Sequence, residues 1–120
     1  MMGLWPTTAI FLATAPTDLR KAYDGLAVLV RQSLGQDPLS GSLFVFCNRR
    51  RDRIKILYWD ADGFALWYKR LEEGTFKMPR VSSDAAGVEL KASELAMMLE
   101  GIDLRSVKRT KRFSAASRRA

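Results

Sequence analysis

The residues best suited to chemistry lie in one short stretch, residues 48–55, which reads Asn-Arg-Arg-Arg-Asp-Arg-Ile-Lys. Five of the seven side chains from residue 49 onward are positively charged: Arg49, Arg50, Arg51, Arg53 and Lys55. Guanidinium groups match the geometry of phosphate oxygens, so arginines at a hairpin tip can contact a nucleic-acid backbone or enter a groove. The stretch therefore predicts a nucleic-acid-binding hairpin. The alternative is a solvated turn that keeps the strand ends soluble.

Aromatic side chains follow the basic stretch on two segments that alternate like β-strands: Tyr58, Trp59, Trp67 and Tyr68. Surfaces that bind single-stranded nucleic acid combine basic groups with aromatic side chains on which bases stack. Trp67 falls on the same face of its segment as Lys69, so both are candidate contacts. The competing explanation is core packing, which is favoured because a small sheet needs large residues on at least one face.

The net charge of +7 comes from the C-terminal end of the chain. Residues 1–103 contain 13 Lys and Arg and 13 Asp and Glu, whereas residues 104–120 contain seven basic residues and no acid. We expect a single domain over residues 1–103 and a basic, flexible tail over residues 104–120. Such a tail attracts polyanions, usually nucleic acid, or serves only as a solubilising end. Its candidate contacts are Lys108, Arg109, Lys111 and Arg112.

The composition argues against catalysis. The chain has no histidine, and its only cysteine, Cys47, lies in an apolar segment typical of an inert buried thiol. Asp60 and Asp62 form an Asp-x-Asp-Gly sequence, but the later ligands of a calcium loop are missing and the pattern also suits a hairpin turn. Metal-dependent phosphoryl transfer needs about three convergent carboxylates, for which 120 residues leave little scaffold. We therefore predict no enzyme activity, no metal and no cofactor.

No segment approaches the roughly 20 apolar residues that span a bilayer. Residues 9–13 are apolar and residues 13–15 (Ala-Thr-Ala) resemble a signal cleavage site, but no Lys or Arg precedes Arg20 and the apolar run is short. The sequence therefore predicts a short buried strand at residues 9–13 and a cytoplasmic protein with no membrane partner.

The spacing of apolar residues predicts one long N-terminal helix. Thr17 is the expected N-cap and Asp18 follows it, where the helix dipole favours an acid. Apolar side chains then recur every three or four residues as far as Leu34, and Gly35 is a natural stop. A second, shorter helix is expected from about residue 93 to 102.

Three strands are predicted between the helices, over residues 43–47, 53–59 and 64–69. Their connections, residues 48–52 and 60–63, are short and rich in turn formers, so consecutive antiparallel pairing is expected. Short extended pieces near residues 75–78 and 88–90 could extend the sheet. The predicted fold class is α+β: a small antiparallel β-meander of three to five strands, packed by the long N-terminal helix and the short C-terminal helix.

Several longer motifs also resemble those of a known family. They are residues 18–26 (Asp-Leu-Arg-Lys-Ala-Tyr-Asp-Gly-Leu), residues 37–60 around the basic stretch, residues 63–79, and residues 99–103 (Leu-Glu-Gly-Ile-Asp). Over roughly residues 8 to 105 the chain resembles the TnpB accessory protein, the second-open-reading-frame product of bacterial insertion sequences of the sixty-six family. The resemblance implies a role as an accessory to transposition with no established reaction, beside a separate transposase that carries the catalytic acids.

Two functions are compatible with this sequence. The first is a non-catalytic accessory protein that contacts transposon-end DNA through the basic hairpin and the tail. The second is an adaptor that docks on the transposase through the aromatic residues or the first helix, without binding DNA. The expected partners are therefore DNA and the transposase or other proteins of the same element.

Overall fold

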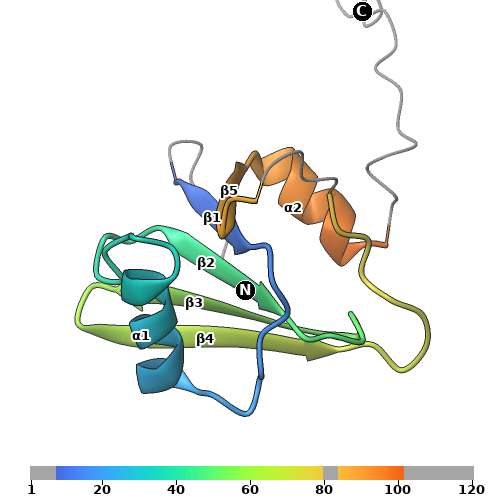
Figure 1. Cartoon of the computed structure of the whole chain (residues 1–120), viewed down its shortest axis with the longest axis horizontal. Coiled ribbons are helices and arrows are strands. Elements are labelled where there is room, and N and C mark those ends of the chain that lie inside the picture. The colour runs from blue at the N-terminus through green and yellow to red at the C-terminus, as the bar shows by residue number, and fades with distance from the viewer. Residues whose placement is uncertain (1–7, 80–83, 102–120) are drawn as a thin grey trace, which may run out of the picture.

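The computed structural model describes residues 8–79 and 84–101, which contain five strands and two helices (Figure 1). In chain order the elements are β1 (Ile10–Ala13), α1 (Tyr23–Gln32), β2 (Leu43–Cys47), β3 (Arg53–Asp60), β4 (Gly63–Arg70), β5 (Gly87–Leu90) and α2 (Ala92–Leu99).

The strands form one mixed sheet in the order β4-β3-β2-β1-β5. The three strands β2, β3 and β4 pair antiparallel in succession, as their short connections predict, with Val45 opposite Ile56 and Ile56 opposite Trp67. The chain between β1 and β2 includes α1 and makes a crossover, so β1 runs parallel to β2. The last strand, β5, pairs antiparallel with the other edge of β1.

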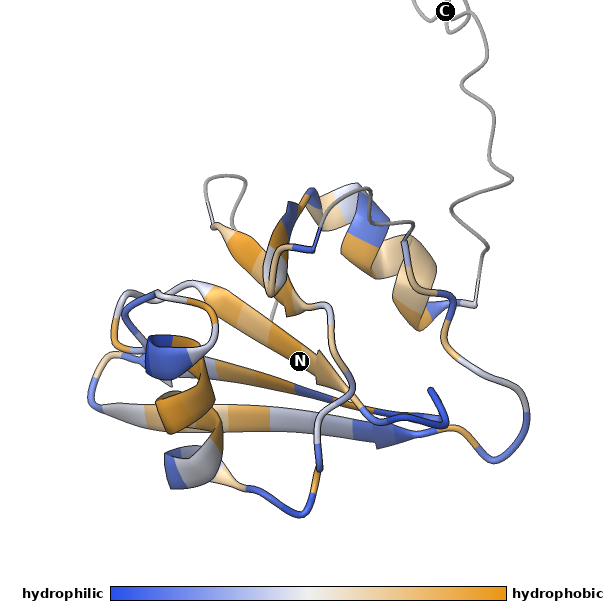
Figure 2. Ribbon diagram, in the orientation of Figure 1, coloured by the Kyte–Doolittle hydropathy of each residue, from blue (hydrophilic) through white to orange (hydrophobic). Residues whose placement is uncertain are grey.

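The two helices cover opposite faces of the sheet. Leu26, Ala27 and Val30 of α1 pack on a face that includes Phe44 and Phe46 of β2. On the other face, α2 is buried against a second cluster through Leu95 and Met98, and β2 contributes Leu43, Val45 and Cys47. Every residue of β2 is buried, which explains why this segment is apolar at successive positions (Figure 2).

The predicted antiparallel meander with a long N-terminal helix is wrong. The sheet has five strands and is mixed, and α1 has only ten residues, beginning at Tyr23 rather than near Thr17. The backbone N–H of Thr17 instead donates to the carbonyl of Cys47 at 2.9 Å, so this segment crosses the end of β2 before any helix begins. Leu19 is buried there outside the helix, which gave the apolar spacing its helical appearance.

The remaining sequence predictions fare unevenly. The short buried strand near residues 9–13 is confirmed as β1, although the sequence did not indicate its parallel pairing. Residues 75–78 form no strand, and Phe76 is instead buried in the core beneath α2. The second helix ends at Leu99, while residue 102 and the basic tail lie outside the described residues. Neither helix of the described ranges is long and apolar enough to cross a membrane.

Candidate nucleic-acid interface

The turn between β2 and β3, residues 48–52, is held together by one side chain. The amide oxygen of Asn48 accepts the backbone N–H groups of Asp52 (3.1 Å) and Arg53 (3.0 Å), and its Nδ2 donates to the Asp52 carboxylate at 2.8 Å. The hydrogen bond from Asn48 lowers the pKa of Asp52 below its ordinary value, so this acid stays charged inside the turn. Asn48 thus closes the turn without using any arginine side chain.

A second segment braces the same turn from the side. The N–H of Leu71 donates to the carbonyl of Asp52 at 2.8 Å, and the N–H of Phe76 donates to the carbonyl of Arg51 at 2.7 Å. Since Phe76 is buried in the core, the backbone at the tip of the turn is anchored to the body of the protein. The tip is therefore a fixed part of the fold.

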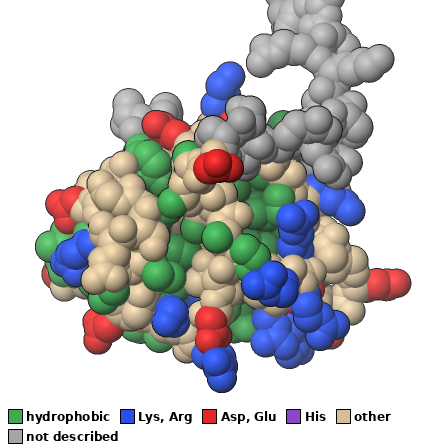
Figure 3. Space-filling view, in the orientation of Figure 1, with side chains coloured by type: hydrophobic (Ala, Val, Ile, Leu, Met, Phe, Trp, Pro, Cys, Tyr) green, Lys and Arg blue, Asp and Glu red, His purple; other side chains and the backbone are tan. Residues whose placement is uncertain are grey.

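Four arginines project from this braced turn, and we call them the hairpin cluster: Arg49, Arg50, Arg51 and Arg53. All four are exposed. Among the described residues, no ion pair or side-chain hydrogen bond engages their guanidinium groups; the ion pairs found there are Arg20 with Asp18 and Arg70 with Glu72. Figure 3 shows Lys and Arg side chains gathered at the end of the molecule where this turn and the end of β4 lie. The hairpin cluster is thus a patch of net positive charge, which the one carboxylate of the turn, Asp52, offsets only in part.

Lys55 has a different environment from the cluster. Its side chain is only 8% exposed, its Nζ donates to the carbonyl of Lys21 at 2.9 Å, and the same atom lies 4.9 Å from the centre of the Tyr68 ring. A buried ammonium needs such partners, because an unpaired buried charge is costly. Lys55 therefore ties the segment before α1 to the sheet and does not reach out to a ligand.

The aromatic residues divide between the two faces of the sheet. Trp67 lies opposite Ile56 and is half-buried against the core cluster on the α2 face, with the exposed Lys69 further along the same strand. Tyr68 lies opposite Lys55, on the α1 side, and is 49% exposed. The alternation along β4 separates these two residues correctly but does not show which helix covers which face.

A groove runs between the hairpin cluster and the segment that precedes α1. It has a volume of about 640 Å³ and is lined by Pro16–Arg20 on one side, by Asn48, Arg49, Arg50 and Arg53 on the other, and by Tyr68. The Arg20 guanidinium contacts the Asp18 carboxylate through Nε (3.0 Å) and Nη2 (2.7 Å), and this pairing lowers the pKa of Asp18. The sequence analysis did not consider Arg20 as a contact, and it named Tyr68 among the aromatic residues without selecting it as a contact.

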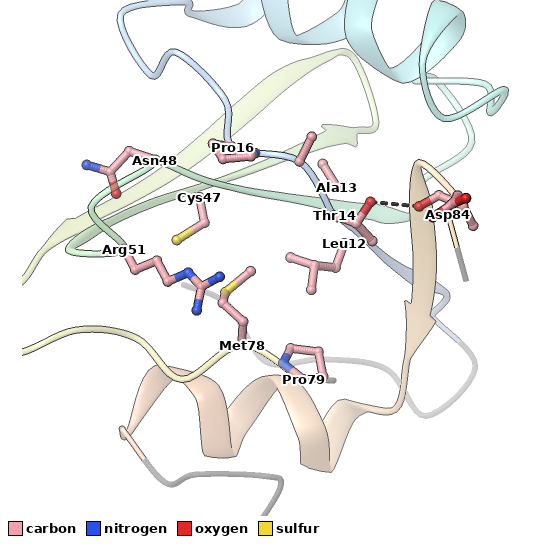
Figure 4. A pocket seen from close by; sticks show the side chains of 12 residues that line it. Leu12, Ala13, Thr14, Pro16, Cys47, Asn48, Arg51, Met78, Pro79 and Asp84 are labelled. Atoms are coloured by element: carbon pink, nitrogen blue, oxygen red, sulfur yellow. Dashed lines mark hydrogen bonds between the residues drawn. The ribbon is translucent and has the colours of Figure 1, made fainter. Parts of the chain in front are cut away.

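A second cavity, of about 490 Å³, lies at the carboxyl ends of β1 and β2 (Figure 4). The Arg51 side chain points into it near Cys47 and Met78, and Thr14 at its edge donates through Oγ1 to the carbonyl of Ala85 at 2.7 Å. Burial raises the pKa of the Cys47 thiol to about 11, so the thiol is protonated at neutral pH and is not an activated nucleophile.

Residues that could perform metal chemistry do not come together in the described ranges. No group of three or more Cys, Asp or Glu side chains there is placed to hold a metal ion. Asp60 and Asp62 lie in the exposed turn between β3 and β4, at the opposite end of β3 from the hairpin cluster. The candidate contacts Lys108, Arg109, Lys111 and Arg112 lie outside the described residues.

Comparison with known proteins finds a matching family model and two similar proteins. Residues 8–109 match the family model described as IS66 Orf2 like protein. The chain is 39% identical over 109 residues to the uncharacterized protein y4jC of Sinorhizobium fredii, covering 91% of this chain and 92% of the relative. It is 35% identical over 101 residues to the uncharacterized protein y4hO of the same organism, covering 84% of this chain and 86% of the relative. No solved structure matches.

Proposed function

Because the chain belongs to the IS66 Orf2-like family of insertion-sequence proteins, we propose that it is a non-catalytic accessory protein of transposition that contacts DNA. The contact is made by the hairpin cluster, with the basic tail as a second positive element. The observation that carries this proposal is the hairpin cluster itself: four exposed guanidinium groups without an ion pair among the described residues, on a turn whose backbone is anchored to the core.

Electrostatics supports a polyanionic partner. Four like charges on one turn repel one another, and the single carboxylate of Asp52 offsets only part of this charge. Binding a phosphate backbone relieves this repulsion and releases the counterions condensed on the DNA, which favours association. The anchored backbone of the turn also lowers the ordering cost of binding, because only the arginine side chains have to be ordered.

The proposal is tested by titrating labelled DNA with the full chain at several salt concentrations. The native protein should bind with an affinity that falls steeply with salt, by a log–log slope of about 0.9 for each phosphate contacted on duplex DNA. The triple variant Arg49→Ala, Arg50→Ala, Arg51→Ala should bind more weakly and lower that slope by about 2.7. Arg31→Ala, an exposed arginine on α1, is the control and should leave both quantities unchanged.

Two outcomes would contradict the proposal. One is an unchanged affinity and slope in the triple variant. The other is no binding to any oligonucleotide in dilute buffer. A version of the protein ending at residue 103 separates the contribution of the tail, because it keeps the hairpin cluster and removes the seven C-terminal basic residues.

The adaptor function is favoured by a different surface. Tyr23 and Val28 of α1 are 45% and 43% exposed, so this helix presents two large apolar side chains to a partner. If α1 docks on the transposase, the two proteins should co-purify after nuclease treatment and in high salt. Val28→Ser should then weaken the pairing while the triple arginine variant retains it, and loss of the complex on nuclease treatment would contradict this function.

A further inference from the structure

The groove beside the hairpin cluster contains an aromatic side chain, Tyr68. A surface that contacts only DNA phosphates would not need an aromatic ring. Tyr68 lines this groove together with Arg49, Arg50 and Arg53, and it is 49% exposed. A half-exposed tyrosine ring among unpaired guanidinium groups has the composition of a surface on which unpaired bases stack.

The ring is also held in position from beneath. Lys55 is buried, its Nζ lies 4.9 Å from the centre of the Tyr68 ring, and the hydrogen bond from Nζ to the carbonyl of Lys21 fixes the ammonium. A cation over an aromatic ring attracts it, so Lys55 favours the arrangement in which the Tyr68 ring lies beside the ammonium. A restrained ring loses little conformational entropy when a base stacks on it.

The charges of the groove suit one strand of a phosphate backbone. Arg49, Arg50 and Arg53 lie along one wall, and on the other wall Asp18 is neutralised by its paired contact with Arg20. The volume of about 640 Å³ falls within the range of about 300–1,000 Å³ that is typical of binding sites for small ligands such as a nucleotide. A duplex keeps its bases stacked inside, so the ring of Tyr68 is accessible to a base only when that base is unpaired.

We propose that this groove binds single-stranded DNA, with one unpaired base stacked on Tyr68 and the flanking phosphates at Arg49, Arg50 and Arg53. This inference rests on the proposed DNA-binding function and deepens it, since it states that the protein prefers single-stranded to double-stranded DNA. The protein would thus hold a strand that is exposed at a transposon end.

The test compares a labelled 20-nucleotide thymidine strand with a labelled duplex of mixed sequence, using fluorescence anisotropy and the full chain. Tyr68→Ala should weaken binding of the single strand by about 5- to 150-fold, the worth of one stacked base, and leave duplex binding within about twofold. Tyr68→Phe keeps the ring and should bind like the native protein. Tyr23→Ala is the matched control, because Tyr23 is 45% exposed on α1 and is not part of the groove.

A second measurement uses the native protein and avoids any effect of substitution on folding. A single strand that carries 5-iodouracil, irradiated in the complex, should crosslink at Tyr68, as located by peptide mapping. Crosslinks only elsewhere would overturn the inference. The inference would also be overturned if Tyr68→Ala lowered the affinity for single strand and duplex equally, or lowered neither. Tighter binding of a uridine (RNA) strand than of the thymidine strand would overturn the assignment of DNA.

These outcomes are separable from failure of the proposed function. If the triple arginine variant loses affinity for both DNAs while Tyr68→Ala loses none, DNA binding stands and the stacking site is refuted. If neither DNA binds the native protein, both proposals fail together.

Discussion

The two turns at the ends of β3 reverse the chain in the same sheet but differ in almost every other respect. The turn at residues 48–52 is basic, is closed by the side chain of Asn48, and is braced by Leu71 and Phe76. The turn at residues 60–63 is acidic and shorter, and in the described residues no side-chain hydrogen bond closes it. Reversing the chain therefore needs neither arginines nor a brace, which indicates that the basic turn has an additional purpose.

The largest difference should appear when the charges of the two turns are reversed. Arg49→Glu combined with Arg50→Glu should lower DNA affinity by about 100-fold or more, because two charge-assisted contacts become repulsions. The matched change at the other end, Asp60→Lys with Asp62→Lys, should alter affinity by less than about threefold. Anisotropy titrations at fixed salt measure both, and similar effects at the two turns would show that only net charge matters.

The next prediction concerns the side chain that closes the basic turn. Asn48→Ala removes three hydrogen bonds in a half-buried position and should lower the free energy of unfolding by about 2 kcal/mol. Asp62→Ala in the acidic turn should change it by less than about 0.5 kcal/mol. Urea denaturation followed by circular dichroism measures both values. Equal losses at the two turns would contradict the distinction between them.

A smaller change in the free energy of unfolding is expected from glycine substitutions at the two positions with strained backbone, Arg51 and Ala61. Arg51 and Ala61 both have positive φ, 62° and 59°, in the left-handed region that glycine adopts more readily. Arg51→Gly and Ala61→Gly should therefore each raise the free energy of unfolding, by up to about 1 kcal/mol.

The two glycine variants should differ in binding. Arg51→Gly should also weaken DNA binding, whereas Ala61→Gly should leave it unchanged, as measured on the same labelled DNA. If Arg51→Gly gains stability without losing affinity, Arg51 serves only the turn and is not a DNA contact.

The smallest effect concerns pH. Asn48 holds the pKa of Asp52 below its ordinary value of 3.8, so the folded state favours the charged form. The resulting stability is present above pH 3.8 and is lost as the pH falls through the lowered pKa of the folded protein. Asp52→Asn should therefore make acid denaturation below pH 3.8 less steep, as followed by circular dichroism. Identical acid denaturation curves for Asp52→Asn and the native protein would contradict this assignment.

The local parts of the fold were predictable because they depend on residues that are close together in the sequence. Alternation indicates β3 and β4, continuous apolar runs indicate β2 and the strand near residue 10, and turn formers indicate both turns. The parallel pairing of β1 with β2 was not predictable, because the sequence of a short strand does not indicate which strand it pairs with. The helix prediction failed at Leu19, whose burial comes from a segment pinned to Cys47 and not from a helix.

The candidate site was predictable in charge but not in geometry. The arginines of the turn are evident as a run, yet Lys55 and Lys69 look equally suitable in the sequence. Only the packing shows that Lys55 is buried against Lys21 while Lys69 is exposed. Arg20 and Tyr68 escaped selection for the same reason, since the groove that joins them is formed by segments about 30 and 50 residues apart in the chain.

The brace from Phe76 to Arg51 has a mechanical consequence. A pull on anything held by the basic turn passes through the carbonyls of Arg51 and Asp52 into the chain that leaves β4, and from there into the interior around Phe76. Loosening of the turn would have to break the two backbone hydrogen bonds that Leu71 and Phe76 donate to it. Release of a DNA strand under tension would then require breaking its contacts to the arginines or disturbing the core beneath α2.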